Sequence, residues 1–204
     1  MALNVGGIVL CGGESRRMGR AKAWLPFGRE LMLQRIVRLM REVVDPIVVV
    51  AAPDQDVPPL DPPVTLVRDS RQGRGPLEGL SAGLRGMAAL GADAAFASST
   101  DVPFLQPGFV RRLVELLGDS MIAVPRVHDR HHPLAAVYRT AVLPDIERLL
   151  AADRLRPLFL FDAVPARVVE AAELLDVDPT LQTLRNLNTP EDYEAALRES
   201  GQEP

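Results

Sequence analysis

The sequence predicts a three-layer α/β fold in which helices cover both faces of a mostly parallel sheet. Short apolar runs with the length of buried strands alternate along the chain with longer segments whose apolar residues recur at helical spacing. The first strand, helix and strand are expected at 8–11, 31–44 and 47–50. A strand, helix and strand in so short a span imply parallel pairing of the two strands.

The later elements follow the same alternation. Pro- and Asp-rich residues at 53–63 and Gly-rich residues at 69–79 predict loops, each of which leads into the next element. The strands expected after the first unit are 64–67, 94–97 and 121–124, and the helices expected are 80–90, 109–117, 142–150, one that starts at 154–157 and one that starts with Thr189 as its N-cap and Pro190 at its first position. No repeat or linker is visible, so residues 1–204 are expected to form a single domain.

The composition limits the classes of function that fit. The 204 residues are 47% hydrophobic, which suits one α/β domain with a sizeable core. A formal net charge of −4 argues against a nucleic-acid partner and favours a small anion bound at a local basic patch. The single cysteine, Cys11, excludes a disulfide framework. No basic leader and no apolar run of about 20 residues is visible, so we expect a cytoplasmic protein with no membrane segment.

The stretch after the first strand has the composition of a phosphate-binding loop. Gly12 and Gly13 let the backbone turn and come close to a ligand, because neither carries a Cβ atom. Backbone N–H groups in such a turn bind anions, and Arg and Lys neutralise phosphate. The cations that follow are Arg16, Arg17, Arg20 and Lys22. A solvated basic loop is the alternative, but the position directly after a strand and two glycines favours phosphate binding.

The same stretch resembles the signature of the MobA-like nucleotidyltransferases, LxGGxSxRMGxxKxxLpxxG. The matching residues are Leu10, Gly12, Gly13, Ser15, Arg17, Met18, Gly19, Lys22, Leu25 and Gly28. Members of that family attach GMP, or CMP in sister families, to molybdopterin. The resemblance implies the Rossmann-like nucleotide-diphospho-sugar transferase fold, with an antiparallel strand near Ala135. It also implies transfer of GMP from GTP to the terminal phosphate of molybdopterin, with release of pyrophosphate.

The resemblance also implies roles for individual residues. Arg17 and Lys22 would stabilise the triphosphate, and Asp101 would hold the Mg²⁺ cofactor, with Asn188 as any second protein ligand. The position of Asp101 supports this role independently, because ligands of parallel sheets bind at the carboxyl ends of the strands. The residues expected to bind the nucleotide are Leu10, Cys11, Gly12, Gly13, Ser15, Lys22, Asp69, Gly75, Pro76, Leu77, Gly79 and Asp101.

A second set of residues is expected to bind the acceptor. By the resemblance, the loop around His132 opens toward the acceptor, and the two asparagines of the N-x-N-T-P-E run lie near the metal and the acceptor. The acceptor residues expected are His132, Arg154, Arg156, Asn186 and Asn188. A zinc site at His128 and His131 is the alternative for the histidine-rich loop, but no cysteine or fourth ligand stands nearby. Transient contact with proteins that insert or receive the molybdenum cofactor is also expected.

Two alternatives remain open, and a hydrolase pattern is disfavoured. The donor could be CTP, or the acceptor a sugar phosphate, since guanylyl members often have Asn where this chain has Ala51. A non-catalytic nucleotide-binding protein is a rival of another class, although simple binding does not require the metal carboxylate of Asp101. The G-x-S-x-G pattern at 79–83 matches a hydrolase elbow, but the residues before Ser81 cannot form the strand that such an elbow needs.

Overall fold

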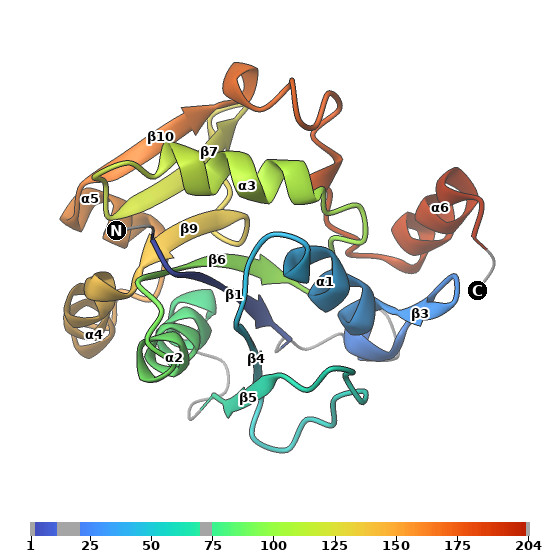
Figure 1. The fold of residues 1–204 in the computed structure, drawn as a ribbon, viewed down its shortest axis with the longest axis horizontal. Helices are drawn as coiled ribbons and strands as arrows, with labels where there is room; N and C mark the ends of the chain where they lie inside the picture. The colour runs from blue at the N-terminus through green and yellow to red at the C-terminus, as the bar shows by residue number, and fades with distance from the viewer. Residues whose placement is uncertain (1–2, 12–20, 70–74, 203–204) are drawn as a thin grey trace.

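The computed structural model describes residues 3–11, 21–69 and 75–202. Within these ranges, the strands of the main sheet are β1 (Val5–Leu10), β4 (Ile47–Ala51), β5 (Thr65–Arg68), β6 (Ala94–Ser99), β7 (Ile122–Val127), β8 (Arg130–His131), β9 (Ala136–Arg139) and β10 (Ala166–Glu170). Their order across the sheet is β10-β7-β9-β6-β1-β4-β5, and β8 pairs with β7 (Figure 1). The predicted unit of β1, a helix and β4 therefore lies beside β6 at the centre of the sheet.

The sheet is mostly parallel, as predicted. Strand β1 pairs in parallel with both β4 and β6, β4 pairs in parallel with β5, and β7 pairs in parallel with β10. Strand β9 is antiparallel and lies between β6 and β7, with Ala136 opposite Ala97. The antiparallel strand expected near Ala135 is therefore confirmed.

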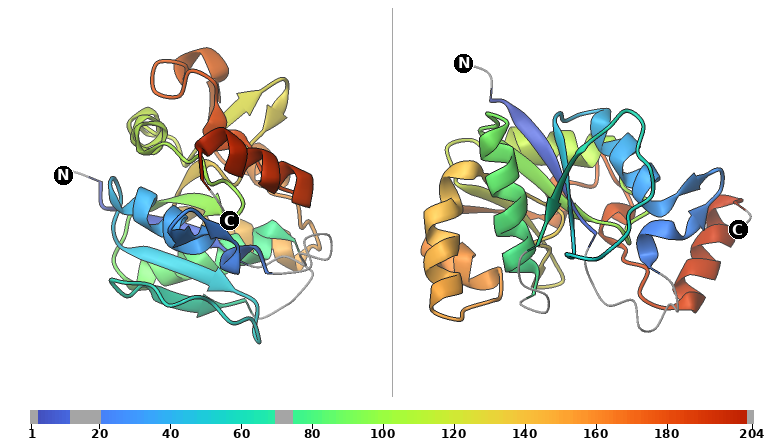
Figure 2. Two further views of the ribbon diagram at one scale, coloured as in Figure 1. Left: turned by 90° about the vertical axis from the view of Figure 1, so that its right-hand side faces the viewer. Right: turned by 90° about the horizontal axis from the view of Figure 1, so that it is seen from below.

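Helices cover both faces of the sheet. Helices α1 (Met32–Arg41) and α3 (Pro107–Leu116) lie on one face, and α2 (Pro76–Ala89), α4 (Leu143–Ala151) and α5 (Leu158–Ala163) lie on the other (Figures 1 and 2). Because side chains alternate along a strand, Val9 joins the core under α1 whereas Ile8 and Leu10 join the core under α2. The three-layer fold class is confirmed, and none of the helices in the described ranges is long and apolar enough to cross a membrane.

A third, smaller core lies beyond the carboxyl ends of the central strands. It joins the short hairpin of β2 (Pro26–Phe27) and β3 (Glu30–Leu31) to the C-terminal helix α6 (Pro190–Ser200), which lies beside the hairpin in Figure 1. Its buried side chains are Leu25, Phe27, Met32, Leu187, Ala196 and Leu197. The Tyr193 hydroxyl of α6 also donates a hydrogen bond to the Pro26 carbonyl. The hairpin and the C-terminal helix thus form one packed unit, which we call the accessory unit.

Several boundaries differ from those the sequence predicts. Helix α2 begins at Pro76 rather than Leu80, because Gly75 takes a positive φ of 78° as the N-cap and Pro76 suits the first helical turn. The helix expected from 154–157 begins at Leu158. Strand β10 was not predicted, because it is an edge strand on which only Val169 is fully buried. The two-residue strands of the accessory hairpin are too short for any periodicity to reveal.

Candidate functional site

The candidate site lies where the central strands β1 and β6 end. The two strands run in register, so that Leu10 at the end of β1 stands beside Ser99 at the end of β6. Asp101 follows Ser99 by two residues, and its side chain is 13% exposed. The placement of Asp101 just beyond the carboxyl end of a buried strand is therefore as expected, and this edge is where parallel sheets bind ligands.

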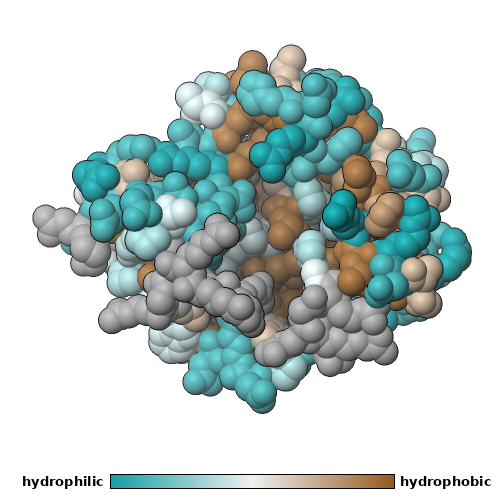
Figure 3. Space-filling model, turned by 180° about the vertical axis from the view of Figure 1, so that it is seen from behind, coloured by the Kyte–Doolittle hydropathy of each residue, from teal (hydrophilic) through white to brown (hydrophobic). Residues whose placement is uncertain are grey.

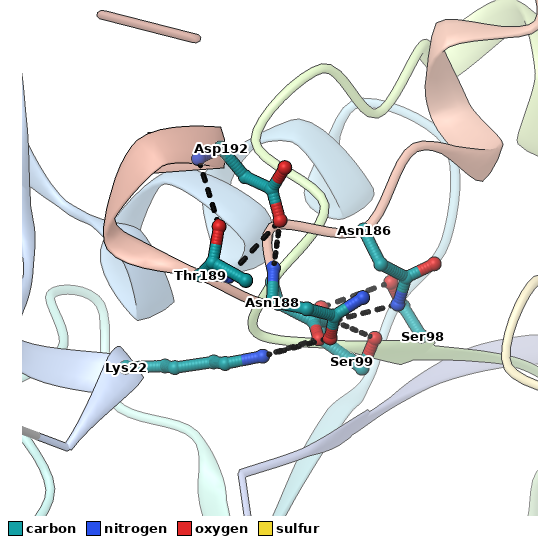
Figure 4. Close-up of polar contacts among 8 residues, drawn as sticks. Lys22, Ser98, Ser99, Asn186, Asn188, Thr189 and Asp192 are labelled. Carbon is teal, nitrogen blue, oxygen red and sulfur yellow. Dashed lines mark hydrogen bonds and ion pairs between the residues drawn. The ribbon is translucent and has the colours of Figure 1, made fainter. Parts of the chain in front are cut away.

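Asp101 is the centre of a polar cluster, and its partners Lys22, Ser99, Asn186 and Asn188 are labelled in Figure 4. Its Oδ2 atom lies 2.8 Å from Nζ of Lys22, whose side chain is 20% exposed. Its Oδ1 atom accepts hydrogen bonds from Ser99 Oγ at 2.5 Å and from Asn186 Nδ2 at 3.0 Å. Asn188 Oδ1 lies 3.4 Å from the same Lys22 ammonium. The structure thus brings four predicted residues together, namely Lys22, Asp101, Asn186 and Asn188, and it adds Ser99.

The cap of helix α6 fixes the position of Asn188. Thr189 Oγ1 accepts a hydrogen bond from the Asp192 backbone at 3.2 Å, and Pro190 stands at the start of the helix. The Asp192 carboxylate accepts hydrogen bonds from the backbone N–H groups of Asn188 and Thr189, both at 3.0 Å, and these bonds lower the pKa of Asp192. The predicted N-cap is confirmed, and it holds Asn188 at the edge of the site (Figure 4).

Contacts from the accessory unit and from helix α1 hold the loop that carries Asp101. The Leu187 N–H donates to the Asp101 carbonyl at 2.8 Å, and Arg35 Nε donates to the Pro103 carbonyl at 2.7 Å. The Phe104 ring packs edge-on against the Phe27 ring, with 5.8 Å between centroids. Lys22 and Asn188 therefore face Asp101 across a junction that is packed on both sides.

The residues expected around the nucleotide lie near the end of β1 and the start of α2. A Cβ atom built on Gly79 would stand 3.4 Å from the Leu10 side chain and 3.9 Å from Asp69 Oδ2, so these three residues are neighbours. Leu77 is fully buried, so its side chain packs in the core and only its backbone can face a ligand. Gly75 and Pro76 form the start of the helix. Gly12, Gly13, Ser15 and Arg17 lie outside the described residues.

Cys11 has a half-buried partner that the sequence did not reveal. The Gln55 side chain donates from Nε2 to the Cys11 carbonyl at 2.9 Å and lies 3.4 Å from the Cys11 thiol. Gln55 is itself held by Arg68, whose guanidinium donates to the carbonyls of Ala52 and Gln55. Burial raises the pKa of the Cys11 thiol to about 12. The ends of β1, β4 and β5 are thus joined by side chains where the phosphate loop is predicted to begin.

The Cys11 thiol is expected to stay unreactive in the folded protein. It is 6% exposed, and with a pKa of about 12 it carries almost no thiolate at pH 8. A chromogenic disulfide reagent should therefore modify native protein far more slowly than protein unfolded in guanidinium chloride. Equal rates in the two states would show that Cys11 is not held in the core.

The predicted acceptor residues fall into two groups. Asn186 and Asn188 lie in the Asp101 cluster, whereas no hydrogen bond among the described residues joins His132, Arg154 or Arg156 to Asp101. Burial, followed by the nearby Arg130 and His131, lowers the pKa of His132. Arg154 stacks over the Phe159 ring at 4.1 Å, and the Leu155 carbonyl lies 3.6 Å from the Cβ position of Gly75, so this turn borders the start of α2.

The donor set around Asp101 suits a hard cation. Within the described ranges, no group of three His, Cys, Asp or Glu residues could hold a metal, which leaves the zinc alternative without support there. The Lys22 ammonium, however, lies between Asp101 Oδ2 and Asn188 Oδ1 and stands where a positive charge is favoured. Mg²⁺ prefers oxygen ligands and is commonly held by one or two carboxylates plus substrate phosphates. Asp101 and Asn188 therefore fit Mg²⁺.

The surface of the molecule also offers room for a small ligand. The space-filling view from behind shows a hollow in the middle of that face, with an apolar floor and mostly hydrophilic side chains above it (Figure 3). An apolar hollow with a few polar groups is typical of small-molecule sites.

Comparisons with known proteins point to one family. The family model of the MobA-like NTP transferase domain matches residues 7–168. A probable molybdenum cofactor guanylyltransferase of Mycobacterium avium is 38% identical over 197 residues, which cover 95% of each chain. The molybdenum cofactor guanylyltransferase of Rhodobacter capsulatus is 36% identical over 194 residues, again 95% of each chain. The crystal structure of molybdopterin-guanine dinucleotide biosynthesis protein A from Archaeoglobus fulgidus shares the fold with a TM-score of 0.79 and 20% identity, over 97% of this chain and 98% of that one.

Proposed function

The chain belongs to the family of MobA-like NTP transferase domains, and from this premise we propose that it transfers GMP from GTP to the terminal phosphate of molybdopterin and releases pyrophosphate. Relatives that cover 95% of the chain are named molybdenum cofactor guanylyltransferases. The observation that carries the proposal is the meeting of Lys22 Nζ and Asp101 Oδ2 at 2.8 Å. It supplies one cation for phosphate and one carboxylate for a metal at the ligand-binding edge of the sheet.

The reaction needs little from the protein beyond position and charge. An oxygen of the acceptor phosphate attacks the α-phosphorus of GTP and forms a new P–O bond, while the bond from the α-phosphorus to the bridging oxygen breaks and pyrophosphate leaves with the electron pair. A phosphomonoester has a second pKa of about 6, so the attacking oxygen is already largely ionised at neutral pH. No general base is required, and the cluster around Asp101 accordingly holds lysine, serine and asparagine side chains but, among the described residues, no histidine.

Asp101 and Asn188 would hold the Mg²⁺ in this proposal. When bound, Mg²⁺ neutralises charge on the triphosphate. Asp101 would contribute Oδ2 and Asn188 its amide oxygen, the two atoms that now flank the Lys22 ammonium. Lys22 would then be free to contact the phosphates, and Arg17 would join it from the predicted phosphate loop. His132, Arg154 and Arg156 are proposed to contact the acceptor. The protein is proposed to work in the cytoplasm, in transient contact with the proteins that insert or receive the molybdenum cofactor.

We expect GTP to be preferred over CTP by about 100-fold or more in kcat/KM. A site that hydrogen-bonds the edge of one base leaves buried polar groups unpaired when another base is bound. In this proposal Asp69, a neighbour of Gly79 and Leu10, would accept such a bond. Pyrophosphate release is measured with purified protein, Mg²⁺, molybdopterin and each NTP in turn.

Each alternative has its own outcome in the same experiment. An equal or higher kcat/KM for CTP would overturn the guanylyl assignment but keep the nucleotidyltransferase class. CTP is the nearer alternative because this chain has Ala51. Faster turnover with a sugar phosphate than with molybdopterin would reassign the acceptor. Nucleotide binding without pyrophosphate release from any pair of substrates would favour a non-catalytic nucleotide-binding protein.

A further inference from the structure

We propose that Ser99 and Asn186 are positioning residues that hold the Asp101 carboxylate so that one oxygen, Oδ2, is presented to the cation. The inference deepens the proposed function, since it concerns the same carboxylate. It assigns to Ser99 a role that no sequence pattern indicated, and it gives Asn186 a contact with Asp101 in addition to its predicted place near the acceptor.

The two oxygens of Asp101 have different surroundings. Oδ1 accepts from Ser99 Oγ at 2.5 Å and from Asn186 Nδ2 at 3.0 Å, whereas Oδ2 faces only the Lys22 ammonium at 2.8 Å among the contacts of the described residues. A carboxylate has about four lone-pair positions, two on each oxygen. Two donors therefore fill the hydrogen-bonding capacity of Oδ1, while Oδ2 keeps the capacity to bind a cation.

Both donors are attached to parts of the backbone that cannot move independently of Asp101. Ser99 is the last residue of β6, it is paired with Leu10 of β1, and it is 9% exposed. Asn186 directly precedes Leu187, whose N–H donates to the Asp101 carbonyl at 2.8 Å. Rotation of the Asp101 carboxylate would break both bonds to Oδ1 at once, so its orientation is set before any ligand arrives.

A fixed carboxylate suits Mg²⁺ for a geometric reason. Mg²⁺ demands near-ideal octahedral geometry at about 2.0–2.1 Å, whereas Ca²⁺ accepts carboxylates through one or both oxygens in flexible geometry. With Oδ1 held by Ser99 and Asn186, Asp101 offers a single oxygen to the metal. Groups that orient a metal ligand in this way commonly change metal affinity or activity by about 10- to 100-fold when they are removed.

Ser99→Ala is the direct test, and the chain provides a matched control in Ser98→Ala. Ser98 is the neighbouring serine of the same strand, it is 1% exposed, and the contact of its hydroxyl is with the Ser99 carbonyl at 3.4 Å rather than with Asp101. Ser99→Thr retains a hydroxyl at the same position and serves as the rescue variant. Asn186→Ala removes the second donor from an exposed residue and gives a test that does not depend on how well Ser99→Ala folds.

The affinity for Mn²⁺, a paramagnetic substitute for Mg²⁺, is measured by electron paramagnetic resonance with GTP bound and no acceptor present. We expect the Mn²⁺ Kd to rise about 10-fold or more in Ser99→Ala and in Asn186→Ala, and to stay within about twofold of wild type in Ser99→Thr and Ser98→Ala. Circular dichroism and thermal unfolding check that each variant is folded.

Two outcomes would overturn the inference. One is an unchanged Mn²⁺ Kd in folded Asn186→Ala and Ser99→Ala. The other is a wild-type protein that binds no Mn²⁺, or an Asp101→Asn variant that binds Mn²⁺ as tightly as wild type. Failure of the proposed function is distinguishable from both, because the measurement involves no turnover. A protein that binds Mn²⁺ through Asp101, loses affinity in the two variants and transfers no GMP would keep the positioning role and lose the guanylyltransferase assignment.

Discussion

Asp101→Asn is expected to abolish metal-dependent pyrophosphate release, to below about 1% of the wild-type rate, because a bound metal supplies several kcal/mol of transition-state stabilisation. The substitution keeps the size of the side chain, so the asparagine carbonyl can still accept the bonds that Asp101 Oδ1 accepts from Ser99 and Asn186. The charge is lost at the other position, where an amide N–H₂ group would face the Lys22 ammonium. Pyrophosphate release is measured against Mg²⁺ concentration for both proteins.

The control for this experiment is Asp119→Asn, which neutralises an exposed carboxylate after α3. It should leave the rate and the Mg²⁺ dependence unchanged. Weak nucleotide binding should survive in Asp101→Asn, since Lys22 remains. A wild-type rate and Mg²⁺ dependence in the Asp101 variant, at equal thermal stability, would make Asp101 a structural residue and place the metal elsewhere.

Much of the fold could be predicted because the buried strands have a simple sequence pattern. Strand β4 (Ile47–Ala51) is buried at every position, with a helix before it and a loop after it in the sequence. Its short run of valines between these segments is typical of a buried parallel strand, so the strand could be predicted. Strand β10 (Ala166–Glu170) has the opposite character, with exposed and half-buried residues around Val169, and no apolar run marks it. The sequence therefore predicted the centre of the sheet better than its edge.

The candidate site could be predicted in part for a similar reason. The rule that ligands bind at the carboxyl ends of parallel strands placed Asp101, and the glycine-rich basic motif led to Lys22. Ser99 could not be singled out, because a serine at the end of a strand is common and only the structure places its hydroxyl against the Asp101 carboxylate. Gln55 was missed because its contact with Cys11 spans 44 residues and belongs to no motif.

The site is assembled from two separately packed parts of the chain. Ser99 and Asp101 come from the sheet, whereas Lys22 and Asn188 flank the small core of the accessory unit. The hydrogen bond from the Leu187 N–H to the Asp101 carbonyl and the contact between the Phe104 and Phe27 rings join the two parts. Because the contacts of the proposed site cross this junction, substitutions in the accessory unit can alter the site without touching the sheet.

Lys22→Ala is expected to weaken transition-state stabilisation by about 2 to 4 kcal/mol, which lowers kcat/KM by about 30- to 1,000-fold. Lys22 is the cation of the described site that faces Asp101, and it is held at the end of the predicted phosphate loop by the turn at Lys22–Trp24. Arg29→Ala is the matched control, because it removes an exposed cation from the turn of the accessory hairpin. Steady-state pyrophosphate release is compared for the three proteins, and turnover of Lys22→Ala within twofold of wild type would exclude Lys22 from the site.

Metal binding separates the two roles that Lys22 could have. The Lys22 ammonium occupies the side of Asp101 Oδ2 that a metal would use. Removing that ammonium takes away a competing positive charge, so Mn²⁺ binding in the absence of nucleotide should become tighter while turnover falls. A lysine that only fixed the position of Asp101 would give the opposite sign, with weaker Mn²⁺ binding in Lys22→Ala. The direction of the change in Mn²⁺ Kd therefore decides whether the Lys22 ammonium competes with the metal for Asp101 or merely orients the carboxylate.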